Sequence, residues 1–202
     1  MSAVPTSRFT IQEYLARERD AQAKSEYYRG QIFAMAGGTY RHNTIVGNLF
    51  ARLYAKLTGT GCTASTSDQR IRVPDNDFNT YPDVSVVCGE PKFDDEDRDA
   101  IINPRVLVEV LSPSTENYNR GNKFVLYRGS ATLREYILVS QERPHIERFT
   151  RQENGSWLLT EFDGLNETLE FTSLDCVLPL AEIYTNVKFG PDTDAPALQL
   201  HG

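Results

Sequence analysis

The chain has 202 residues, of which 40% are hydrophobic and 24% are charged, as is usual for a globular protein with its own core. No apolar stretch is long enough to span a membrane, and the N-terminus has no signal pattern, so we expect a cytoplasmic protein without a membrane partner. The net charge of −7 excludes a generic nucleic-acid coat protein. It does not exclude an enzyme whose carboxylates hold a cation that acts on phosphates.

The cysteine content agrees with that location. The chain has three cysteines, Cys62, Cys88 and Cys176, which are far apart in the sequence. An odd number of widely spaced cysteines fits a reducing cytoplasm and excludes a zinc site of the CxxC type.

The first third of the chain predicts two helices and a short strand. Thr10 and Glu13 form a capping-box pattern that opens a helix over residues 10–23. A turn at Gly30 leads to a strand over residues 31–36. A second helix is expected over residues 40–58, because its apolar residues recur at three- and four-residue spacing. These residues are Ile45, Val46, Leu49, Phe50, Leu53, Tyr54 and Leu57.

Two further strands are expected before the middle of the chain. Residues 62–73 alternate loosely and residues 81–87 form a short apolar strand with Asp83 near its start. The polar residues 74–80 between them predict a loop. The acidic residues 94–97 are typical of a solvated surface.

Residues 106–111 form a near-continuous apolar run that contains one carboxylate, Glu109. A short aliphatic run of this kind predicts a buried central strand. An isolated carboxylate there is costly unless it is paired or binds a metal. Glu109 therefore needs a partner. The sequence Ser-Pro-Ser-Thr ends the strand, and a helix follows as far as Gly129.

The remaining chain predicts mostly strands. They are expected over residues 134–140, 145–151, 156–162 and 168–171, with a hairpin turn at Asn154 and Gly155 and a short helix over residues 179–184. The order of elements predicts an α/β (α+β) fold, with a central mixed sheet flanked by helices. We expect one domain over residues 1–189 and a disordered tail over residues 190–202.

The chain offers Asp83 as the partner of Glu109, since the two acids lie on short apolar strands that can be neighbours. Converging carboxylates repel one another unless a divalent cation lies between them, and oxygen ligands favour Mg²⁺ or Mn²⁺ over zinc. The alternative is that Asp83 caps a turn and that Glu109 pairs with a buried arginine.

Lys123 favours the metal site. It lies in the helix after the Glu109 strand, with Tyr127 one turn further along the same face. An ammonium beside a metal and a water can orient that water or balance charge on a phosphate. The alternative for a single lysine is a solvated helix position.

The order of these motifs resembles that of the Uma-type family of restriction endonucleases, bacterial proteins of the PD-(D/E)XK nuclease superfamily. The resemblance runs from Glu26 and His42 through Pro82 and Asp83 to the sequence VEVLSPST, which contains Glu109. It continues through Lys123, Tyr127 and the strand after them. It covers roughly residues 8–188, nearly the whole chain.

The resemblance implies a restriction-endonuclease-like core and roles for particular residues. Asp83 and Glu109 would hold Mg²⁺, with the carbonyl of Val110 as a third ligand, and Glu26 would reach the metal shell. The superfamily's lysine is expected two residues after Glu109, where this chain has Leu111. Lys123 would take its place, as in relatives whose lysine has moved to the following helix.

Three other residues are candidate substrate contacts. His42, at the start of the second helix, could contact a phosphate or have a structural role. Gln69 could line the cleft and Tyr127 could face it. Arg70 and Arg72 are expected to pair with surface acids.

These observations predict a Mg²⁺-dependent endonuclease with Mn²⁺ as a substitute, acting on nucleic acid, most plausibly DNA, and working as a homodimer. Asp83, Glu109, Lys123 and Glu26 would be its catalytic residues. Two alternatives stay open. Asn119, where many relatives have Asp, would suit a nuclease-fold protein that binds or scaffolds without cutting. The third possibility is a metal-dependent hydrolase of a small phosphodiester.

Overall fold

The computed structural model describes residues 8–113 and 115–190, and the expected tail lies outside them apart from Gly190. Its centre is a mixed six-stranded sheet in the order β11-β10-β9-β8-β6-β3. In chain order these strands are β3 (Cys62–Thr66), β6 (Val84–Cys88), β8 (Val106–Leu111), β9 (Glu135–Ser140), β10 (His145–Arg151) and β11 (Trp157–Asp163). Within the described strands of this sheet, β8 and β9 pair in parallel and the other neighbours pair antiparallel, so the expected mixed sheet is present.

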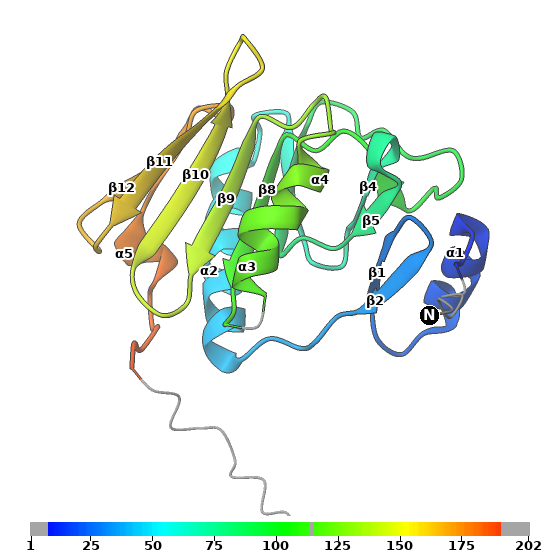
Figure 1. Cartoon of the computed structure of the whole chain (residues 1–202). Coiled ribbons are helices and arrows are strands. Elements are labelled where there is room, and N and C mark those ends of the chain that lie inside the picture. The colour runs from blue at the N-terminus through cyan, green and yellow to red at the C-terminus, as the bar shows by residue number, and fades with distance from the viewer. Residues whose placement is uncertain (1–7, 114, 191–202) are drawn as a thin grey trace, which may run out of the picture.

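A second, five-stranded sheet in the order β2-β1-β5-β4-β7 lies beside the first (Figure 1). Its strands are β1 (Ser25–Tyr28), β2 (Gln31–Ala34), β4 (Arg70–Val73), β5 (Phe78–Thr80) and β7 (Ala100–Ile101). A separate hairpin pairs β12 (Thr168–Phe171) with β13 (Cys176–Pro179). The single sheet expected from the sequence is therefore divided, and residues 62–73 contribute one strand to each large sheet.

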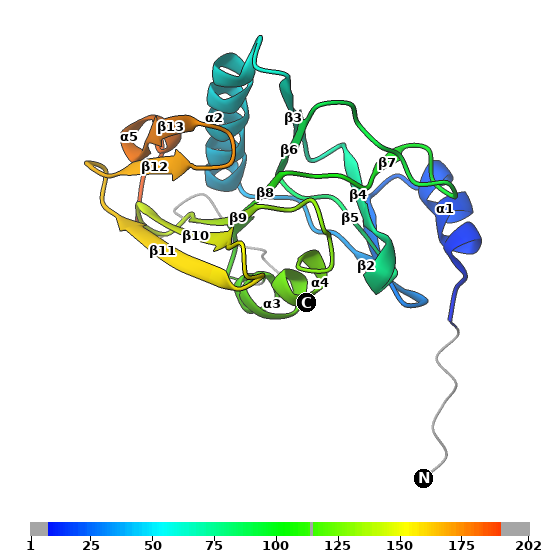
Figure 2. The ribbon, with the colours of Figure 1, turned by 90° about the horizontal axis from the view of Figure 1, so that it is seen from above.

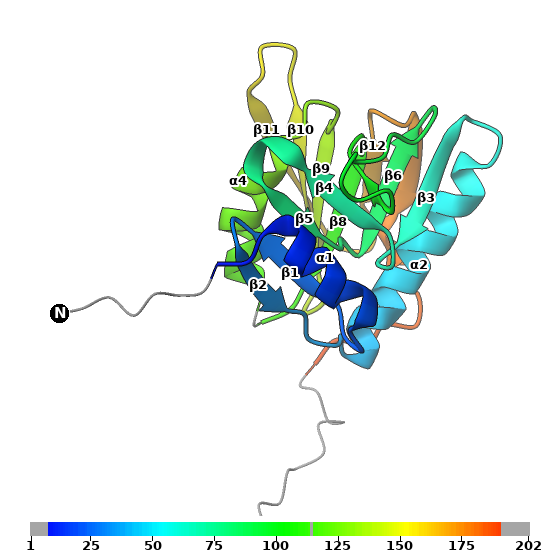
Figure 3. The same cartoon turned by 90° about the vertical axis from the view of Figure 1, so that its right-hand side faces the viewer.

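Helices cover both faces of the six-stranded sheet (Figure 2). Helix α2 (Tyr40–Leu57) covers one face, and the segments α3 (Glu116–Tyr118), η2 (Asn119–Lys123) and α4 (Phe124–Tyr127) cover the other. Helix α1 (Ile11–Asp20) packs on the second sheet, beside β1 (Figure 3), and α5 (Leu180–Ile183) follows β13. A short 3₁₀ turn, η1 (Pro74–Asn76), precedes β5. No helix in the described part of the chain is both long and apolar enough to cross a membrane.

Helix α2 buries the face that its spacing predicts. Ile45, Leu49, Leu53 and Leu57 recur every four residues, and each is at most 1% exposed. They pack against Val108, Ile137 and other aliphatic residues of the sheet. The Thr39 side chain begins the helix by accepting a hydrogen bond from the His42 backbone N–H.

The opposite face of the sheet has an aromatic core. Phe124 of α4 lies within 5.5 Å, between ring centroids, of Tyr136, Phe149 and Trp157. These contacts hold the α3–α4 segment against β9, β10 and β11. The segment is not a regular α-helix, because η2 has π-helical hydrogen bonding. Single π turns inside helices are frequent at functional sites.

Two sequence-based interpretations are wrong in detail. Residues 74–80 are not a polar loop throughout, because Asn79 and Thr80 belong to β5 and are fully buried. Cys62 and Cys88 are not separate thiols, since they face each other across β3 and β6 and form a disulfide. Only Cys176 is free among the described cysteines. The cysteines therefore give no support to a reducing location.

The packing of α2 predicts a large loss of stability in the Leu49→Ala variant. Removing a fully buried leucine leaves a cavity and should lower the free energy of unfolding by about 2–5 kcal/mol, measured by urea denaturation. Tyr54→Ala is the matched control, because Tyr54 lies on the same helix but is 58% exposed. It should cost no more than about 1 kcal/mol. Equal losses in the two variants would contradict the assignment of the buried face.

Candidate active site

Glu109 has two close partners. All six residues of β8 are buried, and the Glu109 side chain is only 6% exposed. Its Oε1 lies 2.8 Å from Lys123 Nζ and accepts a hydrogen bond from Tyr127 Oη at 2.7 Å. The carboxylate that the sequence places inside an aliphatic strand is therefore paired with a cation, as a buried charge requires.

Lys123 also pairs with Glu26. Its Nζ lies 2.8 Å from Glu26 Oε1, so one buried ammonium bridges two carboxylates. Glu26 comes from β1 of the second sheet, whereas Glu109 comes from the central sheet. Lys123 is only 5% exposed, so the structure excludes a solvated position for it. Lys123 belongs to η2, whereas position 111, at which the resemblance would place a lysine, holds a leucine buried in β8.

Asp83 stands at the end of the β6–β8 ladder. Val84 and Val108 are the last paired residues there, so Asp83 and Glu109 are the first opposed residues beyond the ladder. Asp83 Oδ2 accepts a hydrogen bond from the Val110 backbone N–H at 2.7 Å. This contact brings Asp83, Glu109 and Val110 together at one end of the sheet.

His42 reaches Asp83 from the first turn of α2. Its Nε2 lies 3.2 Å from Asp83 Oδ2. Burial lowers the pKa of His42, but the hydrogen bond and charge of Asp83 outweigh that effect and raise the pKa above its ordinary value. Asp83 and His42 are the more accessible side chains of the site, at 16% and 15% exposure.

The sequence analysis missed two residues of this site. Thr80 Oγ1 donates to Glu26 Oε1 at 2.6 Å, and Tyr118 Oη donates to Glu26 Oε2 at 3.1 Å. Thr80 was hidden in an apparently polar loop. Tyr118 and Lys123 are five residues apart, a spacing that an α-helix would not place on one face but that the i→i+5 pattern of the π turn brings together.

Gln69 is not brought to these residues. Its amide donates to the backbone carbonyls of Arg70 and Asp99, at 3.0 and 2.8 Å, and it precedes β4 in the second sheet. Arg70 and Arg72 pair with Asp97 and Asp77, as the sequence led us to expect. Asp97 is buried, however, so the acidic run 94–97 is not entirely a solvated surface.

Burial determines the protonation of the central groups. It raises the pKa of the Glu109 carboxyl to about 7; the Lys123 ammonium opposes this shift, and the charges of Asp83 and Glu26 add to it. For Lys123, burial lowers the pKa, but Glu109 and Glu26 raise it further and leave it above its ordinary value. Lys123 is therefore a cation at neutral pH and can donate hydrogen bonds but cannot accept a proton.

The donor set fits a hard divalent cation. The hydrogen bonds and ion pairs described above fall on Asp83 Oδ2 and Glu109 Oε1. Asp83 Oδ1 and Glu109 Oε2 receive none of these contacts. An all-oxygen set of carboxylates and a backbone carbonyl suits Mg²⁺ or Mn²⁺.

The pKa of Glu109 predicts a pH-dependent difference between the metal-free wild type and Glu109→Gln. Between pH 4.5 and 7 the folded protein keeps a proton that the unfolded chain has lost, so the wild type loses stability as the pH rises. From pH 5 to pH 8 it should lose roughly 2.5 kcal/mol relative to the variant, measured by urea denaturation with a chelator present. The control is Glu153→Gln, at an exposed position. If the free energy of unfolding of Glu109→Gln changes with pH in parallel with that of wild type, the raised pKa of Glu109 is refuted.

Comparisons with known proteins identify the family of the chain. Residues 11–181 match the Uma2 family, described as "Putative restriction endonuclease". The chain is 36% identical over 172 residues to "Uncharacterized protein sll1609" of Synechocystis, covering 85% of this chain and 97% of the relative. It is 35% identical over 187 residues to "Uncharacterized protein slr1290" of the same organism, covering 93% and 97%.

A solved structure shares the fold. It is described as a putative nuclease belonging to DUF820 from Anabaena variabilis, and it superposes with a TM-score of 0.72 at 17% identity. The match covers 89% of this chain and 99% of that one, and it shows the mixed α+β, restriction-endonuclease-like fold that the sequence predicts. The family match over most of the chain confirms the resemblance seen in its motifs. The chain belongs to the Uma2 family of restriction-endonuclease-like proteins.

Proposed function

We propose that this protein is a Mg²⁺-dependent endonuclease that hydrolyses phosphodiester bonds of nucleic acid, and that its substrate is DNA. One observation carries the proposal: Asp83 and Glu109 are opposed at the first position beyond the β6–β8 ladder, with the buried ammonium of Lys123 held 2.8 Å from Glu109. The family of the chain and the fold that it shares with the putative nuclease from Anabaena variabilis support the same reaction class.

Each residue has a distinct role in this proposal. Asp83, Glu109 and the Val110 carbonyl would hold the cation, which would supply Lewis-acid chemistry to the phosphate and to an attacking water. Lys123 orients the water and balances charge on the phosphate through its fixed positive charge. Its raised pKa excludes it as the general base.

Glu26 acts through Lys123. Both of its carboxylate oxygens are occupied, Oε1 by Thr80 and Lys123 and Oε2 by Tyr118. It therefore fixes the ammonium beside Glu109, which makes it a positioning residue. His42, beside Asp83 at the more accessible side of the site, is placed to contact the substrate phosphate.

The proposal predicts loss of cleavage in the Asp83→Ala variant. Supercoiled plasmid should be nicked with Mg²⁺ or Mn²⁺ and left intact with a chelator. Removing a metal ligand should lower the rate by about 100-fold or more, because the ion contributes several kcal/mol to stabilising the transition state. The control is Asp95→Asn, in an exposed loop. Wild-type cleavage by Asp83→Ala would rule out this site.

A second candidate function is binding of nucleic acid without cleavage. It is favoured by the burial of the site, since none of the side chains of Asp83, Glu109, Lys123 and Glu26 is more than 16% exposed. Calorimetry with Mn²⁺ separates the two functions. Heat of Mn²⁺ binding in wild type that is lost in Asp83→Ala supports catalysis. If Mn²⁺ binds to neither protein, the result supports nucleic-acid binding without cleavage. Cleavage of a model phosphodiester but no polymer would favour a small substrate.

We also propose that the protein acts on duplex DNA as a homodimer, because two strands related by a two-fold axis need two active sites. The edge strand β11 exposes Leu158 and Leu159 at 55% and 46%, which a second subunit could cover. Light scattering after size exclusion should give twice the 22.8 kDa of one chain. A single-chain mass at micromolar concentration would remove the dimer from the proposal.

A further inference from the structure

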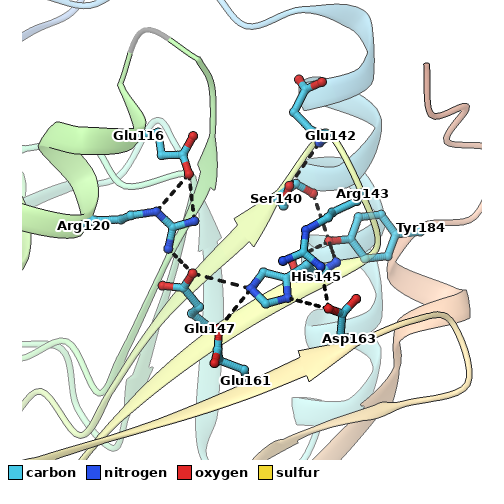
Figure 4. Close-up of polar contacts among 10 residues, drawn as sticks. All are labelled: Glu116, Arg120, Ser140, Glu142, Arg143, His145, Glu147, Glu161, Asp163 and Tyr184. Carbon is cyan, nitrogen blue, oxygen red and sulfur yellow. Dashed lines mark hydrogen bonds and ion pairs between the residues drawn. The ribbon is translucent and has the colours of Figure 1, made fainter. Parts of the chain in front are cut away.

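A second group of ionisable side chains lies on the hairpin of β10 and β11 (Figure 4). His145 is paired with Asp163 across the hairpin, and Glu147 is paired with Glu161. Alternate residues of a strand and their cross-strand partners share a face, so all four side chains lie on one face of the sheet. This is the face covered by α3 and η2. We refer to these four residues as the hairpin cluster.

The imidazole of His145 is buried among three carboxylates, which lie at ion-pair distances from its ring nitrogens. Its side chain is 7% exposed, and its Nε2 lies 3.5 Å from Glu147 Oε1 and 3.5 Å from Glu161 Oε1. Its Nδ1 is buried without a hydrogen-bond partner among the described residues and lies 3.7 Å from Asp163 Oδ2. Hydrogen bonds from nitrogen to oxygen are normally about 2.7–3.2 Å long. The ring is therefore surrounded by carboxylate oxygens at distances longer than those of normal hydrogen bonds.

These ion-pair distances also match the spacing of atoms that share a metal ion. Zinc binds nitrogen and oxygen ligands at about 2.1 Å in tetrahedral geometry, which places two ligand atoms about 3.4 Å apart. The two Nε2 to oxygen distances are both 3.5 Å, and the three ligand atoms lie within 4.8 Å of one another. A three-residue set with one imidazole and two carboxylates leaves a fourth position for water.

The surroundings also suit a metal site. Histidine ligands of zinc usually donate their other ring N–H to a carboxylate, and Asp163 faces His145 Nδ1 in that position. The backbone of His145 is fixed because Tyr184 Oη donates to its carbonyl at 2.9 Å. Glu161 is 60% exposed, so an ion can enter from that side.

The charges of the cluster are only partly balanced. Arg120 pairs with Glu147, and Arg143 pairs with Asp163 at 2.5 Å. In the described part of the chain, the only basic side chain that pairs with Glu161 is His145. A cation bound between His145, Glu147 and Glu161 would neutralise Glu161 and compete with Arg120 for Glu147.

We propose that His145, Glu147 and Glu161 form a binding site for a divalent transition-metal ion of the zinc class, separate from the oxygen-only site at Asp83 and Glu109. Leu138 of β9 lies between Glu109 and Glu147 in the row of paired residues, so the two sites occupy different strands. The imidazole makes the hairpin cluster suited to Zn²⁺, whereas the carboxylates of the first site favour Mg²⁺.

The test uses the full, untagged chain, stripped with a chelator and titrated with Co²⁺ as a spectroscopic substitute for Zn²⁺. The measurements are made in an Asp83→Asn/Glu109→Gln background, which removes the ligands of the first site. One equivalent of Co²⁺ should bind with the visible absorption of four-coordinate cobalt, and Zn²⁺ should displace it. Zn²⁺ should also raise the Tm of this protein.

Substitutions in the hairpin cluster identify the ligands. Glu161→Gln and His145→Gln should each weaken Co²⁺ binding by about 100-fold or more. Substituting a residue that only hydrogen-bonds to a ligand already lowers metal affinity by about 10–100-fold, and losing the ligand itself should cost more. Glu161 is largely exposed, so its variant should keep the fold, as circular dichroism can check. Glu153→Gln, an exposed carboxylate of the same hairpin, is the matched control and should bind normally.

Two results would overturn the proposal. The first is no Co²⁺ or Zn²⁺ binding in the Asp83→Asn/Glu109→Gln background, which would make the hairpin cluster a set of ion pairs around a charged His145. The second is binding that survives unchanged in both Glu161→Gln and His145→Gln, which would place the metal elsewhere. Neither result bears on cleavage at Asp83 and Glu109.

Discussion

The structure depends on one buried ammonium. Lys123 is the cation between Glu26 of one sheet and Glu109 of the other, 2.8 Å from each. Without it, two carboxylates would face one another in a nearly dry interior, which is strongly unfavourable. The Lys123 ion pairs that allow the two sheets to pack together also place a positive charge beside the acids proposed to hold the metal. Stability and chemistry therefore rest on the same atoms.

The π turn at η2 makes this contact possible. It places Tyr118 and Lys123 together over Glu26, and it turns Arg120 toward Glu147 on the neighbouring part of the sheet. One short segment thus contacts both the candidate active site and the hairpin cluster. The aromatic packing of Phe124 against Tyr136 and Phe149 holds the segment down from its C-terminal side.

Much of this arrangement could be predicted from the sequence, for identifiable reasons. Helix α2 and strand β8 have strong patterns, one periodic and the other continuously apolar, and burial followed those patterns. The need of Glu109 for a partner led to Asp83 and Lys123, because a buried charge is rarely left alone. Their placement in the structure agrees with that reasoning, while their catalytic roles stay predictions.

The features that were missed depend on tertiary structure. Thr80 is polar yet fully buried, because β5 lies between β1 and β4. The polar sequence of residues 74–80, taken alone, resembles a loop. Tyr118 was missed because its spacing from Lys123 fits only a π turn. The hairpin cluster requires the register of β10 and β11 to be known, since His145 and Asp163 are distant in sequence but directly opposed.

The disulfide also depends on tertiary structure, and it has a consequence for the site. Cys62 and Cys88 cross-link β3 to β6 at the end of β6 opposite Asp83. A strand that slips by one residue sends every side chain to the other face of its sheet. The cross-link forbids such a slip between β3 and β6, so a covalent bond at the far end of β6 secures the direction of the chain at Asp83, the residue just before that strand.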